Sequence, residues 1–258
     1  MSFSRSSVLR SVLALAALAA GAVTSGAQGR PLPFAAGETL QYVARAPHGL
    51  KGKATMVVDG SETVRGVPTM VLRFDFSTRV GFVTIADHTT SWLDPVRFAA
   101  QRYDKQEVRF MSRHREHVEL EPESSDWTEA DGLKGKSPTT DPLDELSFIY
   151  WLRTLSLPAD SSITLERHFD PARNPTVIRS LGRGHVETPM GTFATREVEM
   201  RVRDTRNYKG EGVIRFSFSD DACRRPVRIE STIPDAGRVV MTLESASPEI
   251  RGCEAGPK

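Results

Sequence analysis

Apolar and polar side chains alternate with a period of two residues along most of this chain, and this pattern limits the possible folds more than any other feature. The alternation runs through residues 39–44, 70–77, 198–203, 214–218 and 239–243. Such a pattern is typical of antiparallel strands that have one buried face and one solvated face. Turn-forming pairs such as Asp59-Gly60 and Arg65-Gly66 separate these segments. We therefore predict an all-β protein, built as a curled antiparallel sheet or a barrel-like fold.

One segment departs from this pattern and predicts a helix. Residues 141–155 read DPLDELSFIYWLRTL, and their apolar side chains recur at helical spacing. Asp141 is a suitable N-cap, and Pro142 suits the first helical position. We therefore predict one short α-helix at about residues 141–155. Its apolar side must cover a face or the mouth of the sheet.

The N-terminus has the pattern of a secretory signal peptide. Arg5 and Arg10 form a basic start, residues 12–23 are apolar, and Ser25-Gly26-Ala27 offers small residues for cleavage. The alternative is an N-terminal membrane anchor, which is less favoured because the apolar run is shorter than the roughly 20 residues that span a bilayer. We predict a cleaved signal peptide at 1–27 and a single β-rich periplasmic domain at 28–258, with no stable membrane anchor after cleavage.

Composition adds a prediction about partners and one about chain organisation. The charges nearly balance, with 34 Lys and Arg residues against 33 Asp and Glu residues and a formal net charge of +1. Binding to nucleic-acid phosphates needs a basic surface, so we do not expect nucleic acid as a partner.

Residues 121–140 are rich in Glu, Ser, Asp, Gly, Pro and Thr. This stretch is predicted to be a flexible linker before the helix.

The chain has two cysteines, Cys223 and Cys253. In an exported protein the compartment is oxidising, so the simplest prediction is that they form a disulfide. Closing a loop of this length contributes about 3–4 kcal/mol in the chain-entropy model. The alternatives are two free thiols or a catalytic cysteine.

Two short polar motifs each allow a chemical and a structural interpretation. His114-Arg115-Glu116-His117 would place two histidines on one face of a helix, as a zinc site needs, but the flanking residues are typical of strands. A charged hairpin is therefore the favoured interpretation. Asp220 and Asp221, followed by Arg224 and Arg225, are either an acid/base pair or a polar turn between two strands. The turn is favoured because it suits the position between two alternating segments.

Other signs of catalysis are weak in this sequence. Glu38, Asp87 and His88 are isolated polar residues within predicted strands, where an outward-facing or satisfied role is favoured. The chain contains no nucleophile elbow, P-loop or dinucleotide-binding motif. We therefore expect no catalytic residue, no metal and no cofactor, and favour a protein that is not an enzyme.

Three aromatic residues of the predicted helix form the candidate ligand-binding site. Phe148, Tyr150 and Trp151 point in different directions on a helix, so they cannot all enter one core. We expect at least one of them, Trp151, to border a groove or cavity. A curled sheet capped by a helix can contain an apolar or lipid-like ligand. The alternative is that the three rings only pack the helix onto the sheet.

Five strings, in this order, resemble the exported bacterial family known as domain of unknown function 3108. They are residues 33–42 (PFAAGETLQY), 48–54 (HGLKGKA), 141–153 (DPL, then LSFIYWLR), 188–193 (TPMGTF) and 219–229 (SDD, then RPVRI). The resemblance implies an exported, β-rich protein of a family with no settled activity and no agreed catalytic residues. Members often carry Trp shortly before the Ser-Asp-Asp string, where this chain has Phe218, which keeps the apolar character. The pair of cysteines is particular to this sequence.

These observations lead to one preferred functional prediction and two alternatives. We predict a non-enzymatic envelope protein that binds an apolar or lipid-like ligand or an envelope protein partner. The first alternative is a periplasmic hydrolase of glycan or peptide that uses carboxylates such as Asp220 and Asp221. The second is a structural module that docks through a sheet edge.

Overall fold

The structure is a computed structural model that describes residues 31–109, 112–204, 209–234, 237–253 and 256. Contacts divide the chain into the units Met1–Pro31 and Leu32–Lys258, and all helices and strands named below belong to the second unit. The predicted signal peptide, residues 1–27, lies outside the described residues. No helix in the described part of the chain is long and apolar enough to cross a membrane.

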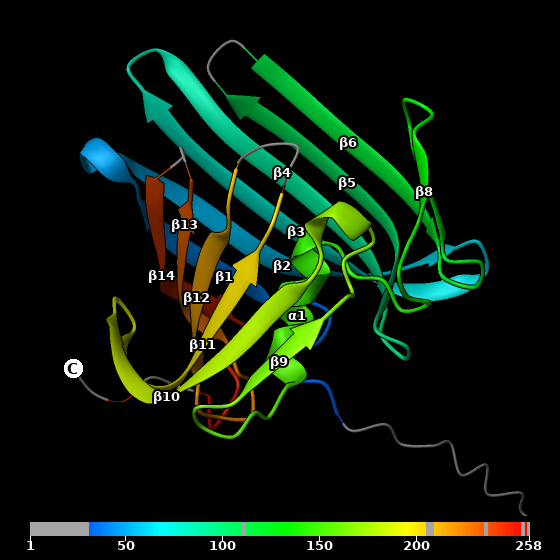
Figure 1. The fold of residues 1–258 in the computed structure, drawn as a ribbon. Helices are drawn as coiled ribbons and strands as arrows, with labels where there is room; N and C mark the ends of the chain where they lie inside the picture. The colour runs from blue at the N-terminus through cyan, green and yellow to red at the C-terminus, as the bar shows by residue number, and fades with distance from the viewer. Residues whose placement is uncertain (1–30, 110–111, 205–208, 235–236, 254–255, 257–258) are drawn as a thin grey trace, which may run out of the picture. The chain divides into compact units, whose positions relative to one another are not determined.

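A single antiparallel sheet of 14 strands makes up most of this unit (Figure 1). The strands are β1 (Thr39–Arg45), β2 (Lys51–Val64), β3 (Val67–Val80), β4 (Val83–Asp94), β5 (Ala99–Arg109), β6 (Ser112–Glu121), β7 (Asp126–Glu129), β8 (Lys134–Lys136), β9 (Ser162–Leu165), β10 (Thr176–Thr188), β11 (Gly191–Val202), β12 (Gly212–Ser219), β13 (Pro226–Ile233) and β14 (Gly237–Ser247). The chain follows two meanders, β1 to β8 and β9 to β14, and the pairing of β1 with β14 joins them. The strands β8 and β9 are the two edges of this open sheet. The predicted all-β class and antiparallel sheet are therefore confirmed.

The strands form where side chains alternate between the core and solvent. In β2, Ala54, Met56 and Val58 are buried, while the residues between them are less buried. The turn that joins β2 to β3 consists of Arg65 and Gly66, which both have positive φ angles, 48° and 84°. Two left-handed residues in a two-residue hairpin loop match the right-handed twist of the flanking strands. Local sequence therefore determines both the strand faces and this turn.

The only α-helix in the described residues is α1 (Glu145–Thr154), inside the range predicted for it. Its N-cap is Asp144, so the prediction of Asp141 as the N-cap was wrong. The Asp144 carboxylate accepts hydrogen bonds from the backbone N–H groups of Leu146 and Ser147, each at 2.9 Å. Upstream, Leu143 forms an isolated bridge with His168, which holds the backbone extended and delays the start of the helix. The described residues also include two short 3₁₀ helices, η1 (Pro47–Gly49) and η2 (Pro171–Arg173).

The main core lies between α1 and the sheet. Side chains from α1 share one buried cluster with side chains from both meanders, and Figure 1 shows α1 between these two sets of strands. The cluster includes Leu40, Tyr42, Met56, Leu72, Leu146, Phe148, Tyr150, Leu152, Ile178, Met200, Phe216, Ile229 and Leu243. The helix therefore covers one face of the sheet, as its apolar side chains predicted.

The stretch 121–140, predicted to be a flexible linker, contains the strands β7 and β8. Trp127 of β7 is buried and packs edge-on against Phe169, with ring centroids 5.8 Å apart. Gly135 of β8 lies against this indole, because a Cβ built on it would meet the Trp127 ring at 2.3 Å. This aromatic contact outweighs the polar composition, so the stretch extends the sheet at its edge instead of linking two parts of the chain.

Candidate functional site

The structure places the three predicted ligand-binding aromatic residues around α1. Phe148 and Tyr150 are buried, and Tyr150 packs edge-on against Phe34 with centroids 4.9 Å apart. Trp151 is partly buried, and the guanidinium of Arg167 lies 5.1 Å from its ring centroid. Phe148 and Tyr150 thus have packing contacts, and Trp151 alone of the three is partly open to solvent. A ligand-binding role for these residues stays a prediction, and none of them lines the cavity described next.

A cavity of about 270 Å³ opens at the C-terminal end of α1. The helix, the segment that follows it, and the strands β10, β11 and β12 all contribute to its wall. The lining residues are Leu152, Leu155, Leu157, Pro158, Ala159, Ser180, Gly182, Arg183, Arg196, Val198, Phe218 and Arg224. Leu152 and Phe218 belong to the buried core, and Val198 packs against it. The cavity therefore has an apolar floor that is continuous with the main core.

Arginines surround this apolar floor. Arg183 of β10 and Arg196 of β11 are directly paired across the two strands. Both bind Asp220, with Arg183 Nε 3.3 Å from Asp220 Oδ2. The hydrogen bond from Arg196 is the main cause that keeps the pKa of Asp220 below its usual range, so this carboxylate stays ionised at neutral pH. Arg224 donates to the backbone carbonyl of Leu155, just after the last turn of α1.

A β-bulge shapes the cavity wall on β10. The pairing register between β10 and β11 shifts between Ser180 and Gly182. Gly182 has a φ angle of 94°, a conformation that suits glycine and is typical of bulges. The bulge precedes Arg183 and thereby sets which face of β10 this arginine shares with Arg196.

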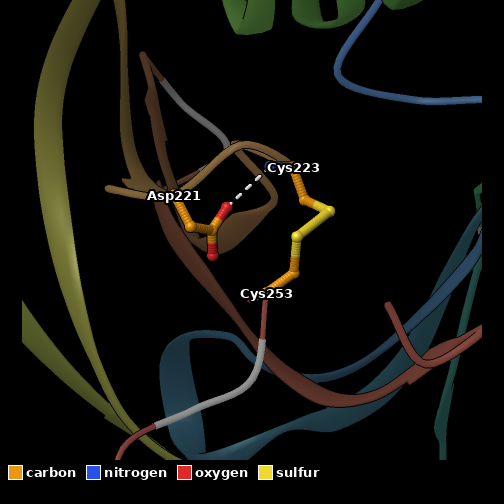
Figure 2. Close-up of side chains that lie close together, drawn as sticks. All are labelled: Asp221, Cys223 and Cys253. Atoms are coloured by element: carbon orange, nitrogen blue, oxygen red, sulfur yellow. Dashed lines mark hydrogen bonds between the residues drawn. A yellow bond between two sulfur atoms is a disulfide. The ribbon is translucent and has the colours of Figure 1, made fainter. Parts of the chain in front are cut away.

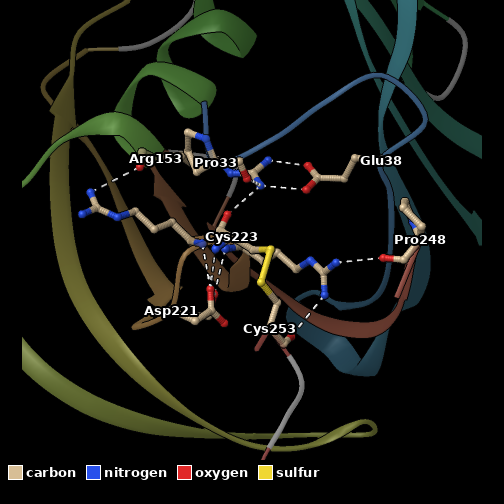
Figure 3. Close-up of a disulfide and its surroundings, with 10 residues drawn as sticks. Pro33, Glu38, Arg153, Asp221, Cys223, Pro248 and Cys253 are labelled. Atoms are coloured by element: carbon tan, nitrogen blue, oxygen red, sulfur yellow. Dashed lines mark hydrogen bonds and ion pairs between the residues drawn. A yellow bond between two sulfur atoms is a disulfide. The ribbon is translucent and has the colours of Figure 1, made fainter. Parts of the chain in front are cut away.

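A buried ion pair fixes the end of α1 beside the cavity (Figure 3). Arg153 is fully buried and binds Glu38 through Nη2 and Oε2 at 2.8 Å. It also donates to the carbonyls of Pro33 at 3.0 Å and Cys223 at 2.9 Å. One side chain thus joins α1, the segment before β1 and the loop between β12 and β13. From the sequence, an outward-facing or satisfied Glu38 was expected, and the structure shows that it is buried and satisfied.

The two cysteines form the predicted disulfide, with Cα atoms 5.9 Å apart. Asp221 lies beside it, and these three residues are the one group of potential metal ligands found among the described residues. Figure 2 shows why they do not resemble a metal site: both sulfur atoms are used in the disulfide, and the Asp221 carboxylate accepts the Cys223 N–H at 2.8 Å. The same oxygen accepts the Arg224 N–H at 2.9 Å. Asp221 therefore caps a turn, as favoured from the sequence.

The remaining candidates for catalysis lie on strands. His114 and His117 belong to β6, and an odd spacing on a strand points their side chains to opposite faces of the sheet. His117 contacts Asp104 at 3.0 Å, and His88 lies beside Asp75 at 2.5 Å. The charged-hairpin interpretation of the histidine motif is therefore the one that the geometry favours.

A cluster of buried and partly buried charges beside the N-terminal end of α1 was not predicted from the sequence. Arg173 of η2 binds Glu145 of α1, Glu116 of β6 at 3.7 Å and Asp204 at 3.5 Å. Lys105 of β5 joins the cluster through Glu145 at 3.4 Å. Burial, followed by the nearby Glu145 charge, raises the pKa of Glu116 to about 7. The alternation of polar residues along β5 and β6 gives no sign that these side chains meet, because the partners come from distant segments.

Glu116→Gln is expected to make the folded state more stable at about pH 8 by roughly 2 kcal/mol. Folded Glu116 keeps its proton up to about pH 7, while the unfolded carboxyl ionises near its ordinary value of 4.5. The folded state thus binds more protons in this window, and the contribution of Glu116 to stability falls as the pH rises through it. Urea unfolding between about pH 5 and pH 8 measures this, with the gain vanishing near pH 5.

The matched control for this prediction is Glu121→Gln, because Glu121 is an exposed carboxylate on the same strand. It should leave both the stability and its pH dependence unchanged. A Glu116→Gln protein that follows the pH profile of the unaltered protein would contradict the prediction.

The open edge of the sheet bears on the docking alternative. β9 pairs with β10 only over Thr176–Arg179, so the rest of β10 has no strand partner on that side among the described residues. This free edge contains the bulge at Gly182 and the charged residues Arg183 and Glu187. Bulges and charges are features that protect sheet edges from pairing with other chains.

Comparison with known proteins identifies the family. The profile of the family described as "Protein of unknown function (DUF3108)" matches residues 42–244. The chain belongs to this family. The match confirms the resemblance seen in the sequence, and it brings no catalytic residue to this DUF3108 protein. None of the curated proteins matches the chain significantly.

Solved structures add information about the fold of this DUF3108 protein. A beta-barrel-like protein of the DUF1849 family from Brucella abortus matches with a TM-score of 0.55 and 12% identity, over 81% of this chain and 96% of the other. A predicted exported protein with a YmcC-like fold from Bacteroides fragilis matches with a TM-score of 0.35 and 12% identity, over 84% and 98% of the chains. A predicted lipoprotein from Parabacteroides distasonis matches with a TM-score of 0.36 and 11% identity, over 84% and 97%. The first of these shows a shared barrel-like fold and carries no information about activity.

Proposed function

We propose that this DUF3108 protein is an exported, non-enzymatic binding protein that holds the apolar part of a lipid-like ligand in the cavity at the end of α1. The observation that carries the proposal is the cavity, where Leu152, Val198 and Phe218 present apolar surface and arginines stand at the edge. Ligand sites are commonly concave and apolar, with a small number of polar groups that orient the ligand.

The size of the cavity limits what it can enclose. Its volume of about 270 Å³ is slightly below the range of roughly 300–1,000 Å³ that is usual for pockets enclosing a whole drug-sized molecule. The cavity therefore accommodates one end of an apolar chain, with the remainder of the ligand outside it.

Export of the protein is supported by two observations of different kinds. The first 27 residues carry the signal-peptide pattern described above. The structure contains a buried disulfide between Cys223 and Cys253, and disulfides persist in oxidising compartments such as the periplasm. Both support a periplasmic location for the mature chain.

Val198→Trp is expected to abolish ligand binding by filling the cavity. Val198 lines the cavity and packs against the core, so an indole at this position takes the space of the apolar chain. Binding can be measured by the fluorescence of N-phenyl-1-naphthylamine, a neutral apolar probe that brightens when it leaves water. We expect a saturable signal with the unaltered mature chain and its loss in the variant.

Val177→Trp is the matched control, since Val177 is a partly buried β10 residue that does not line the cavity. It should bind the probe normally, and both variants should show the unaltered circular dichroism spectrum. A probe signal that survives in Val198→Trp would place binding elsewhere and contradict the proposed site.

Native mass spectrometry of the mature chain, purified gently from bacterial envelope, tests the function without choosing a ligand. A reproducible extra mass that extraction identifies as a lipid would support the proposal. A bare polypeptide mass in repeated preparations, or a stable complex with another protein, would count against it.

A further inference from the structure

We propose that the ligand carries a single carboxylate and that the cavity therefore takes a fatty acid. This inference rests on the proposed function, because it concerns the polar end of the ligand whose apolar end occupies the cavity. It is carried by the arrangement of charges around the apolar floor.

The cavity wall is positively charged. Its lining residues include Arg183, Arg196 and Arg224, and none of the lining residues is an aspartate or a glutamate. Asp220 is not a lining residue and binds two of the arginines. Asp221 is also nearby, but its carboxylate accepts hydrogen bonds from the backbone of the turn and from Ser219. An anion is therefore the ligand charge that this wall favours.

Two of these arginines face each other directly across neighbouring strands. Arg183 of β10 is the register partner of Arg196 of β11. Like charges at directly opposite positions destabilise a sheet, unless an anion lies between them. Asp220 supplies one negative charge for the two guanidinium groups. The pair is left with one uncompensated positive charge, a state that a bound monoanion would relieve.

Arg224 does not add a second free charge to this site. It donates to the backbone carbonyls of Leu155 and Arg153 at the C-terminal end of α1. Helix C-termini carry a partial negative charge of about half an elementary unit, which a nearby cation offsets. Arg224 is thus held at the helix end, and the pair that meets the head group, Arg183 and Arg196 with Asp220, carries a net charge of +1. This net charge matches a carboxylate better than a phosphate, whose charge is about −1.5 to −2.

The exposure of the two arginines places the head group at the surface. The Arg183 side chain is 76% exposed and that of Arg196 is 36% exposed, whereas Leu152 and Phe218 at the floor are buried. A guanidinium binds a carboxylate through parallel N–H donors, so it can hold the head group at the rim. With the head group held at the rim, the alkyl chain of the fatty acid enters the cavity.

The experiment compares ligands of one chain length that differ in the head group. The assay measures how well each of four ligands displaces N-phenyl-1-naphthylamine from the mature chain at low salt. The ligands are dodecanoate, dodecanol, dodecyl phosphate and dodecyltrimethylammonium. We expect dodecanoate to bind about tenfold more tightly than dodecanol, the value of one charge-assisted contact at a partly exposed site. Added salt should reduce this preference, because the ion pair lies at the surface.

Arg183→Gln isolates the arginine contribution without disturbing the core, since this side chain is largely exposed. We expect it to weaken dodecanoate binding by about five- to tenfold while leaving dodecanol within about twofold. Arg179→Gln is the matched control, because Arg179 is an exposed arginine on the same strand that does not line the cavity. It should change neither affinity.

The outcomes separate this inference from the function on which it rests. Equal binding of dodecanoate and dodecanol, unaffected by Arg183→Gln, would overturn the carboxylate while leaving a binding protein for apolar chains. Tighter binding of dodecyl phosphate or of dodecyltrimethylammonium would also overturn it. Failure of every amphiphile and of the probe itself to bind would remove the proposed function.

Discussion

Arg153→Met should lower the free energy of unfolding by about 3–5 kcal/mol, because it leaves the Glu38 carboxylate buried without its charged partner. Arg153 is 0% exposed and Glu38 is 3% exposed in their side chains, so water cannot replace the lost contact. The substitution also removes the donors to the carbonyls of Pro33 and Cys223. Urea unfolding at neutral pH, followed by circular dichroism, measures the loss.

A second substitution distinguishes loss of the ion pair from loss of packing. Glu38→Gln combined with Arg153→Met removes both charges, and we expect this double variant to recover part of the stability lost in Arg153→Met. Arg179→Met is the control, since it removes an exposed arginine and should stay within about 0.5 kcal/mol of the unaltered protein. A loss below about 1 kcal/mol in Arg153→Met would show that the pair does not hold these segments together.

The Glu38–Arg153 pair illustrates a buried contact that the sequence indicates only in part. Glu38 precedes Leu40 and Tyr42 at the same two-residue spacing, which places it on the buried face of the strand. Arg153 follows Leu146 and Tyr150 at helical spacing and so lies on the buried side of α1. The observed burial of both side chains agrees with this spacing, although Glu38 was expected from the sequence to be outward-facing or satisfied. The partnership itself joins residues 115 positions apart, and local sequence carries no information about that contact.

The cavity, like the Glu38–Arg153 pair, is indicated by the sequence only in part. Residues 188–191 read TPMG, a turn-forming sequence, and counting outward from its paired ends, Thr188 and Gly191, places Arg183 opposite Arg196. The other lining residues come from α1, the segment after it and β12, which only the tertiary fold assembles. The sequence thus located the helix, and its assignment of ligand binding to the aromatic residues stays a prediction, while the cavity lies at the C-terminal end of the helix.

Strand faces and the helix followed from periodicity because burial is repeated at every second or every third to fourth residue. The joining of the two meanders did not, because β1 and β14 are separated by nearly the whole described chain and pair through backbone groups that every sequence has. The predicted linker failed for a different reason. Trp127 lies in this polar stretch and is buried in a cluster with residues of β5 and β6, a contact that the composition of the stretch does not indicate.

Removing the disulfide should lower the free energy of unfolding by about 3–4 kcal/mol, because the cross-link restricts the unfolded chain over a long loop. The two cysteines are separated by 30 residues and are both buried. The double variant Cys223→Ala and Cys253→Ala is the appropriate change, since alanine leaves no unpaired hydroxyl in a buried site. Its urea midpoint, compared with that of the unaltered protein, measures the loss.

Reduction supplies the control for this prediction. A reducing agent should bring the unaltered protein to the stability of the double alanine variant and should not change the variant itself. Two free thiols, detected by mass after alkylation of the oxidised protein, would contradict the disulfide. The cross-link also bears on the proposed site, because the turn that contains Cys223 holds Arg224, which lines the cavity, and Asp220, which binds Arg196 of the cavity wall. We therefore expect reduction to weaken binding of dodecanoate as well, which would make the oxidising compartment a requirement of the function and not only of the fold.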